Sequence, residues 1–158
     1  MQIRNAVPGD AAQLSAIAFD AKAVWGYTDA KMAAFRPELT VTADDIRSPQ
    51  SLYRVCEVAG AVVGFHALSP VSGVEVELDA LFVVPAHIGT GVGRCLIVDV
   101  VSLARRRGYA SVCIQSDPNA EGFYCAFGAV RVGERESESV PGRLLPLLCL
   151  SLSASADP

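Results

Sequence analysis

Apolar residues recur with a helical period near the start of the chain. After a short strand predicted at residues 2–7, Asp10 is a typical N-cap for a helix that extends to about Val24. A second, shorter helix is predicted at residues 30–36. Pro37 is expected to end it, because the residue before a proline is biased away from the helical conformation.

In the middle of the chain the period changes to that of strands. Two apolar runs separated by a tight turn, residues 52–58 and 61–68, predict a hairpin. A third run, residues 73–84, alternates apolar with acidic residues, as expected of a strand with two different faces. The alternation changes near Ala80 and Leu81, which predicts a bulge or a newly covered face.

The rest of the chain predicts a strand-loop-helix-strand crossover followed by further strands. Residues 91–107 carry one apolar stripe at helical spacing. Shorter elements follow: a buried strand at 109–115, a helix at 119–127, and strands at 129–133 and 144–152. Pro146 inside the last strand predicts an edge or a bulge. We therefore expect a mixed α/β sheet in one domain over residues 1–152, with a frayed tail at 153–158.

Composition excludes several classes of protein. The net charge of -4 and pI near 5.1 argue against nucleic-acid binding, and no apolar run approaches the length of a membrane span. Five widely spaced cysteines without a metal or disulfide spacing suggest reduced, mostly buried thiols, so we expect a soluble cytoplasmic protein. His66 and His87 lie on different elements without neighbouring ligands, so no metal site is expected.

Three glycines at alternate positions lie between the predicted strand and helix. Gly89, Gly91 and Gly93 leave the backbone accessible and direct several N–H groups to one place, which indicates an anion site. Arg94 stands where the dinucleotide fingerprint needs a further glycine, and no Gly-Lys-Ser/Thr follows as in a P-loop. The alternative is that the glycines only permit a tight turn and close packing.

Two segments together resemble the GNAT superfamily of N-acetyltransferases. Residues 81–94, Leu-Phe-Val-Val-Pro-Ala-His-Ile-Gly-Thr-Gly-Val-Gly-Arg, resemble its acetyl-CoA-binding motif, and residues 121–129 resemble its Phe-Tyr-x-x-x-Gly-Phe segment. Residues 22–27, 116–124 and 140–143 look like a recurrent bacterial type of this family, to which we assign no substrate. The resemblance implies a GNAT-like, mostly antiparallel sheet of six to seven strands with about four helices.

The resemblance also implies a cofactor site and an acid. The residues expected to bind acetyl-CoA are Leu81, Phe82, Val83, Gly89, Thr90, Gly91, Val92, Gly93, Arg94 and Asn119. Ile88 stands where the family usually has Arg or Gln, which shifts the expected contact towards backbone N–H groups. Tyr124 would lie near the sulfur as general acid, the alternative being an ordinary core tyrosine.

Acidic and aromatic residues are candidates for the acceptor side. Glu77 is the expected general base, since the resemblance places a carboxylate on this strand; it shares a strand face with Glu75 and Asp79, and the alternative is a solvated face. Trp25, Tyr27 and Asp79 are expected to line the substrate pocket.

The expected activity is direct transfer of an acetyl group from acetyl-CoA to a primary amine of a small molecule, in a ternary complex. The main alternative is a CoA-binding or metabolite-binding sensor without catalysis, and a third is transfer of a longer acyl group. Homodimers are common among such folds.

Overall fold

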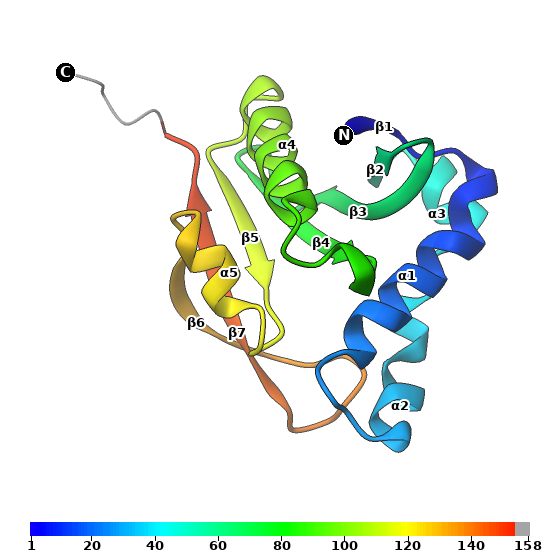
Figure 1. The fold of residues 1–158 in the computed structure, drawn as a ribbon. Helices are drawn as coiled ribbons and strands as arrows, with labels where there is room; N and C mark the ends of the chain where they lie inside the picture. The colour runs from blue at the N-terminus through cyan, green and yellow to red at the C-terminus, as the bar shows by residue number, and fades with distance from the viewer. Residues whose placement is uncertain (154–158) are drawn as a thin grey trace.

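Seven strands form one open sheet in the order β1-β2-β3-β4-β5-β7-β6 (Figure 1). The computed structural model describes residues 1–153, and the predicted tail at 153–158 lies outside them apart from Ser153. The strands are β1 (Gln2–Asn5), β2 (Leu52–Val58), β3 (Ala61–Pro70), β4 (Glu75–Val83), β5 (Ser111–Gln115), β6 (Val130–Glu136) and β7 (Leu144–Ser151). Only β4 and β5 pair in parallel, which confirms the mixed, mostly antiparallel α/β fold.

The helices lie on both sides of this sheet. They are α1 (Ala11–Ala23), α2 (Asp29–Leu39), α3 (Ala43–Arg47), α4 (Val92–Arg106) and α5 (Glu121–Ala126), with 3-10 turns at Pro8–Asp10 and Pro85–His87. In Figure 1, α4 lies across β3 and β4, whereas α1 and α2 lie to the right of the sheet. The sequence did not predict the short helix α3, whose five residues are all at least partly exposed.

The prediction that Pro37 ends the second helix is wrong, because α2 continues through Pro37 to Leu39. The side chain of Leu39 is buried against the apolar core, which stabilises the last turn. The hydroxyl of Thr40 donates a hydrogen bond of 2.7 Å to the carbonyl oxygen of Arg36 and so caps this end. Tertiary packing here outweighs the local effect of the proline.

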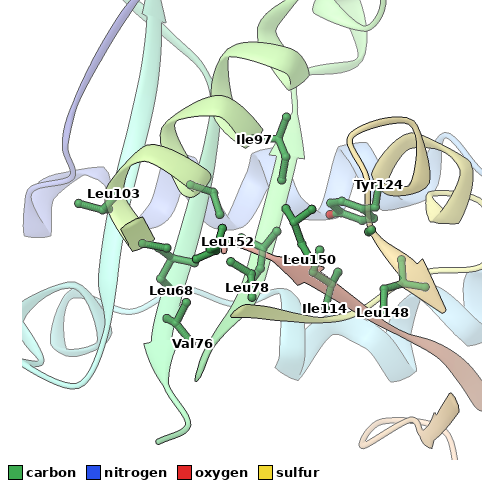
Figure 2. Packing of buried hydrophobic residues seen from close by; sticks show 14 residues of the cluster. Leu68, Val76, Leu78, Ile97, Leu103, Ile114, Tyr124, Leu148, Leu150 and Leu152 are labelled. Atoms are coloured by element: carbon green, nitrogen blue, oxygen red, sulfur yellow. The ribbon is translucent and has the colours of Figure 1, made fainter. Parts of the chain in front are cut away.

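Helix α4 contributes the apolar stripe that the sequence predicts. Its buried residues are Val92, Leu96, Ile97, Val100, Leu103 and Ala104. Figure 2 shows Ile97 and Leu103 packed with side chains from the strands, among them Leu78 of β4 and Leu150 of β7. The start of the helix, directly after the glycine loop, is held by Val92 and Leu96, which pack against Cys56 and Val63 of the sheet.

A bulge divides β4 into two halves, as the change of alternation predicted. Ala67 of β3 lies opposite Ala80, whereas the next residue, Leu68, lies opposite Leu78, so Asp79 is the extra residue. Before the bulge Leu78 faces the α4 side, and after it Leu81 does so. The bulge therefore exchanges the faces to which odd and even residues of β4 point.

The prediction that Pro146 marks an edge is wrong, because β7 lies between β5 and β6. The bulge instead lies on β6, where Val132 is the extra residue opposite Leu147 and Leu148. A proline has no N–H to donate to a neighbouring strand. Pro146 is tolerated because β5 ends at Gln115, which lies opposite Leu147, so no residue of β5 lies opposite the proline.

The five cysteines are free thiols in the described residues, and they differ in burial. Cys56 and Cys113 are buried, while Cys125 is exposed. Cys125 lies between Phe123 and Phe127 in the sequence, two positions from each. The two phenylalanine rings pack against each other on the inner side of α5, with their centroids 5.2 Å apart.

Gly64 of β3 permits the closest approach of the sheet to α4. A Cβ atom at this position would lie 2.8 Å from the backbone oxygen of Phe82 and 3.1 Å from Cδ1 of Leu96. Such a distance to a backbone atom forces the strands or the helix to move.

We expect Gly64→Ala to lower the free energy of unfolding by about 1–3 kcal/mol, because the added methyl group overpacks this contact. Urea denaturation measures the change. Gly133→Ala is the matched control, since a Cβ atom there meets nothing within 4 Å. Equal effects of the two substitutions would contradict the close-packing argument.

A buried ionic cluster joins α4 to the sheet. Nε2 of His66 lies 2.8 Å from Oδ2 of Asp99, and Arg54 donates to both oxygens of Asp99, at 2.8 and 3.1 Å. Burial alone would raise the pKa of Asp99, but the hydrogen bonds from His66 and Arg54 outweigh it and lower that pKa to about 2. The Asp99 carboxylate therefore stabilises the fold in its ionised form.

Asp99→Asn should lower the free energy of unfolding at pH 7 by about 3 kcal/mol, because it removes the carboxylate from the buried His66 and the part-buried Arg54. The lowered pKa makes this contribution present above pH about 4 and progressively lost as pH falls towards 2. The difference between wild type and variant, measured by urea denaturation at several pH values, should therefore shrink over this window. Asp44→Asn is the control, since that side chain is 95% exposed; a pH-independent difference would contradict the assignment.

Candidate active site

The sheet opens between β4 and β5. These strands pair only where Glu75–Glu77 lie beside Ser111–Cys113, after which β5 continues beside β7. From Leu78 to Val83, the edge of β4 that faces β5 has no strand partner within residues 1–153. A cavity of about 620 Å³ begins at this opening and extends from the glycine loop to the end of α1. Such an open backbone edge can pair with an extended, amide-containing ligand.

The glycine loop presents free backbone donors at one end of the cavity. The N–H groups of Gly89, Gly91, Val92, Gly93 and Arg94 donate no hydrogen bond to any described residue. Three of them belong to the first turn of α4, where the helix dipole favours an anion.

Three residues of the loop, Thr90, Gly91 and Gly93, also have structural roles. The N–H and hydroxyl groups of Thr90 both donate to the carbonyl oxygen of His87, at 3.3 and 2.6 Å. A Cβ atom on Gly93 would lie 3.3 Å from the ring of Phe123, so this glycine lets α5 pack closely against the loop. Gly91 has a φ of 94°, which favours glycine over other residues.

Tyr124 of α5 lies in the wall of the cavity and within the apolar core. Its side chain is 7% exposed, and Figure 2 shows its ring beside Leu150. Burial, assisted by the charge of Asp117, raises the pKa of Tyr124 well above its usual value. The phenol therefore carries its proton throughout the neutral pH range.

Carboxylates outnumber cations along the cavity. Its charged lining residues are Glu38, Glu77, Asp79, Asp117 and Glu138, against Lys22 and Arg135. Lys22 pairs with Asp117 and Arg135 with Glu77, which leaves the charges of Glu38, Asp79 and Glu138 without an ion-pair partner among the described residues. This excess of negative charge attracts cations.

Asp79 and Glu77 differ in their surroundings. Glu77 accepts a hydrogen bond from the guanidinium of Arg135. Asp79 makes no ion pair with a described residue and lies in the mouth of the cavity, exposed to water but walled on several sides. Desolvation by these walls, together with the charge of Glu77, raises the pKa of Asp79 to about 6.

A buried polar cluster forms the floor at the α1 end of the cavity. Nζ of Lys22 lies 2.7 Å from Oδ2 of Asp117, which also accepts a 2.7 Å hydrogen bond from the hydroxyl of Tyr27. Arg143 donates to the oxygen of Tyr27 at 2.7 Å, and its guanidinium carbon lies 5.0 Å from the ring centre of Phe35. Hydrogen bonds from Lys22 and Tyr27 outweigh the burial of Asp117 and lower its pKa.

The structure therefore divides the predicted site residues into two groups. Those that line the cavity are Trp25, Glu77, Asp79, Leu81, Phe82, Val83, Gly89, Gly93, Asn119 and Tyr124. Those that do not are Tyr27, Thr90, Gly91, Val92 and Arg94. Of the second group, Gly91, Val92 and Arg94 still direct free N–H groups from the loop, whereas Tyr27 is a member of the buried cluster.

Asn119 lies in the cavity wall, but its side-chain amide is engaged. It donates 2.9 Å to Oδ1 of Asp117 and 3.4 Å to the oxygen of Tyr27. The indole of Trp25, by contrast, is 46% exposed at the cavity rim.

Sequence reasoning missed Arg135, Glu38 and Glu138. Arg135 stands between two other charged residues, Glu134 and Glu136, and its partner Glu77 is 58 positions away. Glu38 and Glu138 resemble ordinary surface acids in the sequence, and no local signal distinguishes them.

The described residues contain neither a metal-binding cluster nor a membrane-spanning helix. No group of three or more His, Cys, Asp or Glu side chains there could hold a metal ion. Within the same residues, no helix combines the length and apolar character that crossing a membrane requires.

Solved structures share this fold. A GCN5-related N-acetyltransferase from Rhodopseudomonas palustris is 24% identical, with 95% of this chain and 94% of that chain covered and a TM-score of 0.75. The PaiA N-acetyltransferase from Thermoplasma acidophilum, in complex with coenzyme A, is 15% identical over 95% and 98% of the two chains, with a TM-score of 0.75. YncA from Salmonella typhimurium, with its cofactor acetyl-CoA, is 23% identical over 100% and 97%, with a TM-score of 0.67.

The cofactors of the last two structures agree with the acetyl-CoA that the sequence predicts. A search of curated proteins gave no match. The family model of the acetyltransferase (GNAT) domain matches residues 20–140. With most of the chain matched and the fold in agreement, the protein belongs to the GNAT acetyltransferase family.

Proposed function

We propose that the protein transfers an acetyl group from acetyl-CoA directly to a primary amine of a small cationic molecule. The observation that carries this proposal is the opening between β4 and β5, which joins a cradle of free N–H groups to a cavity with an excess of carboxylates. The N–H groups of the glycine loop suit an anionic ligand, and the carboxylates at the other end of the cavity suit a cationic one. The two reactants of an amine acetylation differ in charge in this way.

The residues present fit CoA on the side of the glycine loop. The free N–H groups at the start of α4 would hold the pyrophosphate, and the unpaired edge from Leu81 to Val83 would pair with the pantetheine amides. Ile88 is 54% exposed and apolar, so the backbone rather than this side chain would provide the polar contacts. When bound, acetyl-CoA would supply an activated thioester.

Tyr124 is the proposed general acid. Its position in the cavity wall places a protonated phenol in a poorly solvated environment, where a proton can be delivered to a leaving thiolate. Proton acceptance from the amine falls to the carboxylates of β4, of which Glu77 is the one that the sequence favours. Trp25 at the rim and the acids Glu38 and Glu138 are proposed to contact the acceptor.

Tyr124→Phe should lower kcat by about 100-fold, because the variant lacks the proton donor while keeping the ring that packs in the core. Release of free thiol from acetyl-CoA, measured with a panel of small amines, tests this expectation. The thermal stabilisation by CoA should be retained in the variant. Wild-type protein that binds CoA without releasing thiol for any amine, with no effect of Tyr124→Phe, would instead support a sensor without catalysis.

Gly91→Glu should abolish the increase in Tm that CoA gives to wild type. The new side chain strains a residue with a φ of 94° and brings a negative charge to the proposed phosphate site. For wild type, saturation at one hundred times Kd corresponds to about 2.7 kcal/mol of stabilisation. Gly73→Glu, at an open turn position, is the control. Full stabilisation of the Gly91 variant by CoA would show that the glycine loop does not bind the cofactor.

A further inference from the structure

Glu77, the base that the sequence favours, is engaged by a permanent cation. Nη1 of Arg135 donates a hydrogen bond to Oε1 of Glu77, and the guanidinium reaches it from β6 over β7 and β5, where Cys113 pairs with Glu77. A second guanidinium nitrogen of Arg135 lies 3.7 Å from Sγ of Cys113, which fixes its direction. The hydrogen bond occupies Oε1 of Glu77, and the positive charge of the guanidinium beside it repels a cationic amine.

Asp79 lies two residues further along β4 and is free of such a partner. As the extra residue of the bulge it has no opposite neighbour on β3, and it stands where β5 has already diverged from β4. It makes no ion pair with a described residue and lines the same cavity as Tyr124. It thus lies between the acidic acceptor end of the cavity and the unpaired edge of β4.

We propose that Asp79, and not Glu77, accepts the proton of the acceptor amine, and that Glu77, held by Arg135, acts on the reaction only through its neighbour Asp79. This inference rests on the acetyl transfer proposed above. Asp79 would act on the ammonium nitrogen directly or through one water molecule. Glu77 is then a positioning residue that acts through Asp79.

The protons balance in this scheme. Transfer forms a nitrogen–carbon bond and breaks the sulfur–carbon bond of the thioester. An ammonium nitrogen loses two protons when it becomes an amide nitrogen. Asp79 takes the first and passes it to solvent; the second restores the phenol of Tyr124, which has given its own proton to the departing sulfur. No oxidant or metal is needed.

The surroundings of Asp79 support this role. Desolvation by the walls of the cavity mouth raises its pKa to about 6, the hydroxyl of Ser69 on β3 opposes this shift, and Glu77 and Glu138 add to it. The phenol of Tyr53 on β2 also lies close enough to be influenced by Asp79. A carboxylate with this pKa is ionised at neutral pH and is still basic enough to take a proton.

The test compares Asp79→Asn, Glu77→Gln and the control Glu75→Gln by the pH dependence of kcat/KM with one accepted amine. Asp79→Asn should lower kcat about 100-fold and remove the acidic limb near pH 6. Glu77→Gln should keep kcat within about threefold at pH 8 and move the acidic limb to lower pH, because it removes a negative neighbour that raises the pKa. Glu75→Gln should leave the profile unchanged, since Glu75 lies on the same strand outside the cavity.

A second measurement does not depend on turnover. In a ¹³C NMR titration of the protein without ligand, the carboxyl carbon of Asp79 should titrate near pH 6 and at lower pH in Glu77→Gln. Loss of kcat at every pH in Glu77→Gln, with an active Asp79→Asn, would overturn the inference and return the role to Glu77. An Asp79 that titrates near its ordinary pKa would also overturn it. Wild type that acetylates no amine would instead contradict the proposed function, whatever the titration shows.

Discussion

The short parallel pairing of β4 with β5 is the constraint on which the site depends. Three residues of β4, Glu75–Glu77, lie beside β5 before the strands diverge. Because α4 begins at the end of the opened edge, the backbone edge and the helix N-terminus meet in one cleft. The antiparallel partners hold the two sides of the opening, β3 on β4 and β7 on β5. The pairing of the strands therefore determines where the cleft lies, and the side chains determine its shape and charge.

The walls of the cleft are held by contacts between distant segments. Lys22 and Asp117 join the end of α1 to the loop before α5, and Arg143 adds the loop between β6 and β7 through Tyr27. Lys22 and Arg143 both lie beside the carboxylate of Asp117. The guanidinium of Arg143 also lies over the rings of Tyr27 and Phe35. Buried ion pairs of this kind fix geometry more than they add stability. Here they fix the floor of the acceptor end.

Local patterns predicted most of the fold. The hairpin, the strand before the glycine loop and helix α4 follow from periodicity and turn residues, since the signals lie within the elements themselves. The two motifs also predicted which segments would line the cavity. The end of α2 was predicted too early, at Pro37. The helix continues to Leu39 because that side chain is buried in the core, a tertiary contact that the local sequence does not show.

The parts of the site that sequence could not predict are those that depend on pairing across the fold. Spacing alone could not reveal that Arg135 engages Glu77 across 58 positions, or that Tyr27 is held by Asp117 across 90 positions. The bulge could be expected from the change of pattern. Its exact residue, and hence the difference between Glu77 and Asp79, required the register with β3.

The position of Asp79 in that bulge has a consequence for how such a protein can diverge. Every other residue of β4 between Val76 and Val83 has an opposite partner on β3, so a substitution there must also suit a neighbour. Asp79 has none, and its replacement leaves the cross-strand pairs intact. Selection can therefore vary the side chain at this place in the cavity lining while the scaffold is inherited unaltered.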